Sequence, residues 1–268
     1  MTITRRQWLR LSSTATLGTL AGLSAGVIGC GEQSLAPLED AEEGHLLARP
    51  VTPVFSPQIG VNPLGLNNGR DGLRFVPTTF QPGESLPLLV TLHGSGGDAY
   101  GGIQPFLPFA ESARVILISP DSRNVTWDRR YGGFAVDARF IDNALSETFL
   151  RCAIDPAKIA IAGFSDGASY ALSLGLTNGD LFKQIVAFSP GFMIPNVQRG
   201  RPEIFVSHGT RDPVLPIDTS SRVFVPRLQA ANYDVTYREF DGTHQMPPAV
   251  TSEAFAWLQT EWAKATVV

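Results

Sequence analysis

The strongest chemical motif in the chain surrounds a serine, at residues 163–167, which read Gly-Phe-Ser-Asp-Gly. The apolar run Ile159–Ala162 directly precedes this motif, and a helix-like run directly follows it. Glycines two residues on either side of the serine let the backbone turn sharply, so that the hydroxyl projects above a sheet. This context predicts that Ser165 is a nucleophile.

A serine alcohol needs a base within hydrogen-bond reach and a third group that orients the base. Asp212 follows the apolar run Ile204–Ser207, and His244 follows a run that ends at Phe240. Both residues come just after a predicted strand, as Ser165 does, so all three can share one edge of a sheet. We therefore predict His244 as the base and Asp212 as the acid, with Asp218 as the nearest rival for the acid.

The chain contains four histidines, and their surroundings differ. His45 lies in a proline-rich segment, His93 lies beside a glycine turn, and His208 precedes the predicted acid. We expect His208 to be a hydrogen-bonded turn residue rather than a catalyst.

A glycine-rich stretch at residues 92–98 follows another predicted strand. Such a backbone can direct peptide N–H groups at a developing oxyanion, and each donor of this kind contributes about 3 kcal/mol in other enzymes. We predict the amides of Ser95 and Asp166 as the two oxyanion donors.

The same stretch has a competing interpretation as a dinucleotide-binding motif. Residues 94–99 match the pattern G-x-G-x-x-A after a strand, and Asp121 could bind a ribose. Asp121, however, lies 27 residues beyond Gly94 rather than about 20. A dinucleotide site also gives no reason for the order of Ser165, Asp212 and His244.

The elements that must position these residues alternate between short apolar runs and longer amphipathic runs. The predicted strands are Leu73–Val76, Leu88–Leu92, Val115–Ser119, Ile159–Phe164, Ile185–Phe188, Ile204–Ser207 and Val235–Phe240. The predicted helices are Gly102–Ser112, Val136–Cys152, Asp166–Thr177, Ser220–Ala231 and Ala249–Ala265, and Asp155-Pro156 is expected to separate the second helix from the next strand. This alternation predicts one α/β domain with a mostly parallel sheet flanked by helices.

Residues 92–97, 163–167, 208–212 and 242–244 resemble the α/β-hydrolase fold. Specifically, they are similar to its phospholipase/carboxylesterase branch, which includes predicted esterases and polyester-depolymerase-like relatives, and the resemblance runs from about residue 69 to the C-terminus. It implies a serine carboxylic-ester hydrolase that uses Ser165, His244 and Asp212, with an acyl-enzyme and no cofactor. Related carboxylesterases often have glutamine after the serine, so the carboxylate of Asp166 bears on any preference for anionic substrates.

Two other functions remain open on the same residues: a peptidase or acyltransferase, and a non-catalytic binding domain. No zinc-protease, paired-cysteine or P-loop pattern is present in the sequence, so neither a metal nor a cofactor is predicted. The net charge of −4 gives no positive field for a nucleic acid. The expected partner is a small or polymeric ester.

Aromatic and apolar residues after two of the predicted strands could line a substrate pocket. Trp127 and Tyr131 lie after the third strand, and Phe192 and Met193 lie after the strand that ends at Phe188. The alternative is that half of them only anchor loops. No insertion is long enough for a large lid domain, which favours soluble or surface-accessible esters.

The first 29 residues resemble a twin-arginine export signal, with Arg5 and Arg6 before a short, mildly apolar run. The run ends in Val27-Ile28-Gly29-Cys30, which resembles a lipobox whose cysteine receives a lipid. An uncleaved anchor and cleavage elsewhere are the alternatives. We therefore expect export by the twin-arginine machinery and a lipid anchor in the cell envelope, at the periplasmic or outer surface.

The segment 30–60 is rich in proline and acidic residues, and it shows no sustained periodicity. We predict that it is a flexible tether and that 61–268 forms the catalytic domain. Removing residues 1–29 takes away three arginines and no acid, which changes the net charge from −4 to −7. Cys152 is expected to be a buried small hydrophobe, with a Cys30–Cys152 disulfide as the minor alternative.

Overall fold

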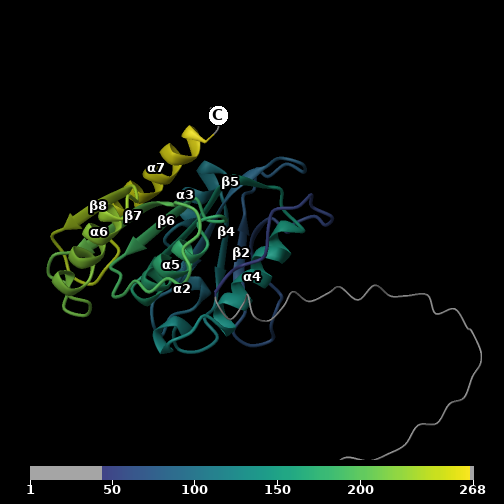
Figure 1. Ribbon diagram of the computed structural model, residues 1–268. Coiled ribbons are helices and arrows are strands. Elements are labelled where there is room, and N and C mark those ends of the chain that lie inside the picture. Colours follow the sequence, from purple (N-terminus) through teal and green to yellow (C-terminus); the bar gives the residue numbers. More distant parts are fainter. Residues whose placement is uncertain (1–43, 266–268) are drawn as a thin grey trace, which may run out of the picture. The chain divides into compact units, whose positions relative to one another are not determined.

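An eight-stranded sheet with the order β1-β2-β4-β3-β5-β6-β7-β8 forms the centre of the computed structural model, which describes residues 44–265 (Figure 1). The strands are β1 (Gly60–Pro63), β2 (Gly72–Val76), β3 (Leu86–Leu92), β4 (Ile116–Pro120), β5 (Ile154–Phe164), β6 (Gln184–Phe188), β7 (Glu203–Gly209) and β8 (Val235–Phe240). The pairs β1–β2 and β2–β4 are antiparallel, and the other five pairs are parallel. The mostly parallel sheet is therefore as predicted.

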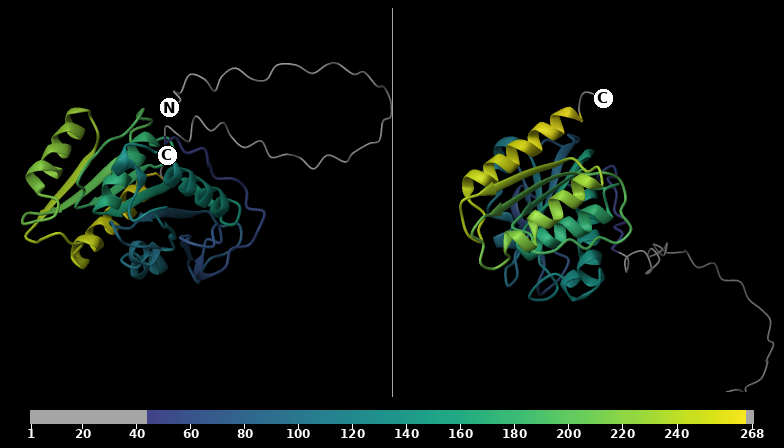
Figure 2. Two further views of the ribbon diagram at one scale, coloured as in Figure 1. Left: turned by 90° about the horizontal axis from the view of Figure 1, so that it is seen from below. Right: turned by 60° about the vertical axis from the view of Figure 1, so that its left-hand side comes forward.

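Helices cover both faces of this sheet (Figure 2). They are α2 (Ala99–Ile103), α3 (Leu107–Ala113), α4 (Val136–Phe149), α5 (Asp166–Thr177), α6 (Ser221–Ala230) and α7 (Pro248–Lys264), with short 3₁₀ turns η1 (Asp128–Tyr131) and η2 (Ile217–Thr219). Buried side chains of α4, α5 and α6 form the core on one face, and those of α2, α3 and α7 form the core on the other.

The two cores explain why the central strands are apolar throughout. Successive side chains of a strand point to opposite faces. In β5, Ile159 and Ile161 enter the core beneath α4 and α5, whereas Ala160 and Ala162 enter the core beneath α7. A strand that is covered on both sides has no polar face to leave for water.

The structure departs from the predictions at one strand and one helix. All seven predicted strands are present, but β1 was not predicted, because this half-exposed edge strand ends in Pro63 and has no apolar run. The single helix predicted at 102–112 is wrong: α2 and α3 are separate helices, with Pro105 between them and Pro108 in the first turn of α3. Proline lacks the N–H that a continuous helix needs.

The expected separation at Asp155-Pro156 is also wrong. Helix α4 ends at Phe149, and β5 already begins at Ile154, so Pro156 lies inside the strand. The pairing of β5 with β3 shifts its register between Leu86 and Leu88. This irregularity allows a proline within the strand, because proline is tolerated where a ladder is interrupted.

The described part of the predicted tether, residues 44–60, lies against the domain instead of being flexible. The N–H of Leu46 donates to Oδ1 of Asn178 at 2.8 Å, and the N–H groups of Leu47 and Ala48 both donate to Oδ1 of Asp142 at 2.8 Å. The side chains of Asn178, at the end of α5, and Asp142, in α4, thus accept the backbone N–H groups of this segment. Such contacts require no periodic pattern of apolar residues in the segment itself. Residues 30–43 and the predicted signal at 1–29, including Cys30, lie outside the described residues.

Within residues 44–265, no helix is both long enough and apolar enough to span a bilayer.

Candidate active site

Ser165 occupies a strained turn between the end of β5 and the start of α5. Its backbone angles are φ 58° and ψ −121°, a positive-φ conformation that is costly for any residue except glycine. The turn is held because the N–H of Ser165 donates to the carbonyl of Phe188 at 2.9 Å. A Cβ on Gly163 would lie 2.2 Å from the carbonyl oxygen of Gly167, so glycine is required where the strand and helix cross.

The three predicted side chains converge. His244, in the loop after β8, has Nε2 at 2.8 Å from Oγ of Ser165 and Nδ1 at 2.6 Å from Oδ2 of Asp212. Ser165 and His244 lie 79 positions apart in the chain. Ser165, Asp212 and His244 follow the carboxyl ends of β5, β7 and β8. These strands are parallel, so their carboxyl ends lie at one edge of the sheet.

Asp212 is held by its own turn as well as by His244. Its Oδ1 accepts the N–H groups of Val214 at 2.8 Å and Leu215 at 2.9 Å. Burial raises the pKa of Asp212, but hydrogen bonds from Leu215, His244 and Val214 outweigh burial and leave this pKa below its ordinary value. The carboxylate is therefore ionised at neutral pH and can stabilise an imidazolium. Asp218, the rival acid, is exposed and pairs with Arg222.

The glycine-rich loop after β3 lies directly beside the serine. A Cβ on Gly94 would be 3.4 Å from Cβ of Ser165. The carbonyl of Gly94 is bonded to Nδ1 of His93 at 2.7 Å and accepts the N–H of Gly97 at 3.0 Å. The N–H of Ser95 belongs to the same trans peptide unit, so fixing this carbonyl fixes that N–H in the opposite direction.

His93 orders this loop in its neutral form, a role that the sequence did not indicate. Nε2 of His93 accepts the N–H of Ser122 at 3.0 Å, so the proton is on Nδ1, which donates to Gly94. Burial lowers the pKa of His93 and favours this neutral form. Ser122 lies 29 positions from His93 in the chain, which explains why sequence spacing alone could not assign this role.

The carboxylate of Asp166 is buried and paired. Thr126 donates to its Oδ2 at 2.8 Å, and Arg130 donates to its Oδ1 at 2.6 Å. The negative charge expected beside Ser165 is thus matched by a guanidinium, and it does not by itself oppose an anionic ester.

The four predicted pocket residues differ in their surroundings. Trp127 is 1% exposed, and its indole N–H donates to the carbonyl of His93 at 2.9 Å, so its assignment to a pocket is wrong and it supports the loop before Ser95. Tyr131 is 70% exposed. Phe192 and Met193 are half-buried, and Met193 packs against the core.

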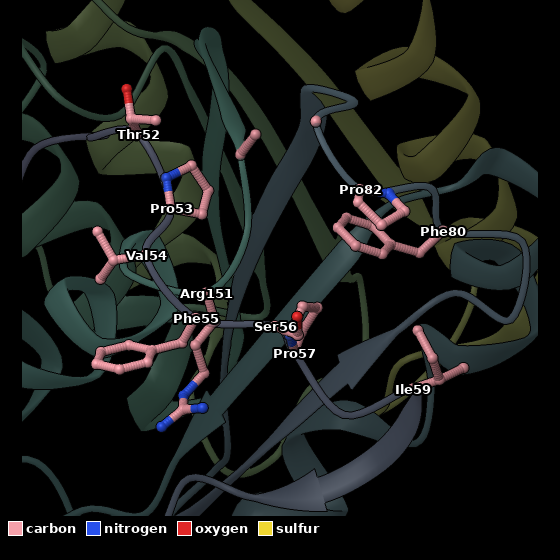
Figure 3. A pocket seen from close by; sticks show the side chains of 12 residues that line it. Thr52, Pro53, Val54, Phe55, Ser56, Pro57, Ile59, Phe80, Pro82 and Arg151 are labelled. Atoms are coloured by element: carbon pink, nitrogen blue, oxygen red, sulfur yellow. The ribbon is translucent and has the colours of Figure 1, made fainter.

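Two pockets are candidates for substrate space, and neither has Ser165, Asp212 or His244 among its lining residues. The larger, of about 560 Å³, lies between residues 52–59 and 80–83, beside Ala153 (Figure 3). It adjoins the start of β5, whereas Ser165 follows the end of that strand. A second pocket of about 420 Å³ includes Met246, two residues beyond His244; its other lining residues are Gln104, Pro105, Pro108, Phe109, Pro248 and Thr251.

Cys152 is buried in the core, and burial raises the pKa of its thiol to about 11, as expected for an inert cysteine. Within residues 44–265, no group of three or more histidine, cysteine, aspartate and glutamate side chains is placed to hold a metal ion.

Comparisons with known proteins agree with this architecture. Residues 135–261 match the phospholipase/carboxylesterase family model. Feruloyl esterase C of Emericella nidulans is 28% identical over 182 residues, covering 63% of this chain and 66% of that protein. A probable feruloyl esterase C of Aspergillus terreus is 26% identical over 159 residues, covering 56% and 58%. The crystal structure of esterase PE8 superposes with a TM-score of 0.58 at 22% identity, covering 70% of this chain and 97% of that one.

The sheet, its flanking helices and the turn at Ser165 have the arrangement of the α/β-hydrolase fold, which confirms the predicted fold. Part of the chain is similar to the phospholipase/carboxylesterase family, and the relatives that it resembles are named esterases. The chain spans 66% and 58% of the lengths of the two curated relatives above.

Proposed function

We propose that the protein hydrolyses carboxylic esters through an acyl-enzyme formed on Ser165. One observation carries this proposal: the imidazole of His244 bridges Oγ of Ser165 at 2.8 Å and the carboxylate of Asp212 at 2.6 Å. That geometry is what a serine needs to lose its proton as it attacks a carbonyl.

In the first half of the reaction, Nε2 of His244 takes the hydroxyl proton while Oγ of Ser165 bonds to the ester carbon. The tetrahedral intermediate collapses, the alkoxy oxygen takes the proton from His244, and the alcohol leaves. In the second half, His244 takes a proton from water, the hydroxide attacks the acyl carbon, and Oγ recovers its proton as the acid is released. Asp212 stays ionised throughout and stabilises the imidazolium.

We assign the amides of Ser95 and Asp166 to the oxyanion that forms in each half. Two observations support this assignment: the bonds of His93 and Gly97 to the carbonyl of Gly94, and the position of Asp166 as the first residue of α5. The first amides of a helix have no partner within the helix and lie at its positive end.

We propose small or exposed esters as substrates, with the pocket beside Met246 receiving part of the molecule. Prolines and Phe109 line this pocket, and Gln104 is one of its few polar groups. Since the two curated relatives described above are named feruloyl esterases, esters of aromatic acids belong among the first substrates to assay.

Fluorophosphonate labelling with intact-mass detection tests the reaction class. We expect one adduct, mapped to Ser165, together with turnover of short-chain p-nitrophenyl esters, and neither in Ser165→Ala. Ser112→Ala, at an exposed serine of α3, should label like the parent. Undiminished labelling of Ser165→Ala would contradict the proposal, and cleavage of an aminoacyl amide without ester turnover would favour a peptidase.

We also propose that residues 1–29 direct export through the twin-arginine machinery and that Cys30 then carries the lipid that anchors the enzyme in the cell envelope. The support is the pattern around Arg5 and Arg6 and the small residues before Cys30. Replacing both arginines with lysine is expected to leave the protein in the cytoplasm in a fractionation assay, whereas Arg10→Lys should not. Continued translocation of the double variant would refute this route.

A further inference from the structure

His208 is a fully buried histidine that touches the acid of the candidate triad. It is the second-last residue of β7, and its side chain is 0% exposed. Its Nε2 lies 2.8 Å from the carbonyl oxygen of Leu215 and 3.2 Å from Oδ2 of Asp212. Its Nδ1 lies 2.7 Å from Oγ of Ser221.

These contacts determine which nitrogen carries the proton. A carbonyl oxygen can only accept a hydrogen bond, so Nε2 must carry the proton and donate it to Leu215; Oδ2 of Asp212 lies further from the same nitrogen, at 3.2 Å. Nδ1 then accepts the hydroxyl proton of Ser221. Burial lowers the pKa of His208, which agrees with a neutral ring that has this single N–H.

The result is a carboxylate whose two oxygens are both held. Oδ1 of Asp212 accepts two amides from its own turn, and Oδ2 faces Nδ1 of His244 and Nε2 of His208. Leu215 contacts both Asp212 and His208: its N–H donates to Oδ1 of Asp212, and its carbonyl accepts from Nε2 of His208. A rotation of the carboxylate would break contacts on both oxygens.

We propose that His208 is a positioning residue for ester hydrolysis: its Nε2–H group fixes the orientation of the Asp212 carboxylate that His244 uses. This inference rests on the proposed function. His208 does not contact Ser165, so it acts through Asp212 alone.

A buried histidine could instead serve only the packing of β7 against α6, and two substitutions separate these roles. In His208→Gln, the amide nitrogen is as many bonds from Cα as Nε2, so it can still donate to Leu215 and Asp212. In His208→Asn, the shorter amide reaches only the position of Nδ1, near Ser221. The two variants carry the same polar group and differ in which contact they keep.

The test is steady-state hydrolysis of a p-nitrophenyl ester by both variants, with thermal unfolding measured in parallel. We expect His208→Asn to lose about 10-fold to 100-fold in kcat with little change in KM, as for a misplacement of about 1 Å. His208→Gln should recover most of the loss. Equal activity of the two variants, or a parental kcat in folded His208→Asn, would overturn the proposal.

The pH profile adds a readout that packing alone would not change. The charged or titratable groups around His208 are Asp212, His244 and, opposite it in β8, Glu239. A carboxylate that rotates away stabilises the His244 imidazolium less, so the acidic limb of kcat/KM should move to lower pH in His208→Asn. An unmoved limb would contradict the positioning role.

One measurement needs no variant, should His208→Asn fail to fold. Long-range ¹H–¹⁵N correlation spectra of the intact enzyme should find His208 neutral and protonated at Nε2, and a proton on Nδ1 would refute the inference. Failure of the proposed function is distinct, since the parent protein would then neither hydrolyse esters nor be labelled at Ser165.

Discussion

Replacing Asp212 with asparagine is expected to lower kcat for ester hydrolysis about 10⁴-fold while leaving the fold intact. Asparagine has nearly the same shape as aspartate, but one of its two terminal groups is a donor. The oxygen must stay where Oδ1 lies, because the N–H groups of Val214 and Leu215 point at that position. The amide NH₂ must then take the place of Oδ2.

That exchange reverses the hydrogen bonding of the base. The NH₂ group would face Nδ1 of His244, so Nδ1 would have to become an acceptor and the ring proton would move to Nε2. Nε2, at 2.8 Å from Oγ of Ser165, could then no longer take the hydroxyl proton. The same NH₂ would also oppose Nε2–H of His208, at 3.2 Å from Oδ2, so both imidazoles would be affected.

Asp218→Asn is the matched control for this substitution. Asp218 is an acid six residues further on, but its side chain is 76% exposed and pairs with Arg222 at 2.7 Å. Exposed pairs of this kind contribute little to stability, so kcat and the unfolding temperature should both stay close to the parental values. Single-turnover and steady-state rates of both variants are the measurement. An Asp212→Asn enzyme that keeps more than about a tenth of its kcat would contradict the assignment of the acid.

The sequence was sufficient to predict the three side chains of the candidate triad because each follows a predicted strand, in the order that this fold uses. Ser165, Asp212 and His244 needed no knowledge of the contacts between them. The residues that hold these side chains and the neighbouring loop in place could not be predicted in the same way. His208 looked like a turn residue, and its contact with Asp212 depends on how the chain folds back between residues 212 and 215. Trp127 looked like a pocket aromatic and instead holds the backbone of His93.

The path of residues 44–60 could not be predicted from the sequence either. Residues 44–60 have the composition of a linker, and groups distant in the sequence fix their path: the side chains of Asn178 and Asp142 and the carbonyl of Leu150 accept backbone N–H groups of this segment. Polar side chains that bind an extended backbone leave no hydrophobic period. Strand β1 was missed for a related reason, since it is short, half-exposed and ends in proline.

Gly167→Ala should destabilise the fold and disturb the site together. A Cβ at this position would lie 2.4 Å from the carbonyl oxygen of Leu92 and 2.5 Å from that of His93. Both atoms are backbone at the end of β3, so relief requires the start of α5 to move away from the loop that carries Ser95. Overpacking of this kind costs about 1–3 kcal/mol and occasionally more. The movement would also separate the two amides that we assign to the oxyanion.

Gly101→Ala is the matched control, because it adds the same methyl group where space exists. Gly101 is exposed in α2, and a Cβ there would meet only Oδ1 of Asp98, at 3.6 Å. Alanine is favoured over glycine within a helix by about 0.5–1 kcal/mol, so this variant should be as stable as the parent or slightly more stable. Urea unfolding of both variants and of the parent makes the comparison. If the two alanine variants unfold at the same urea concentration, the close approach of α5 to β3 is not the constraint that places Ser165 beside its amides.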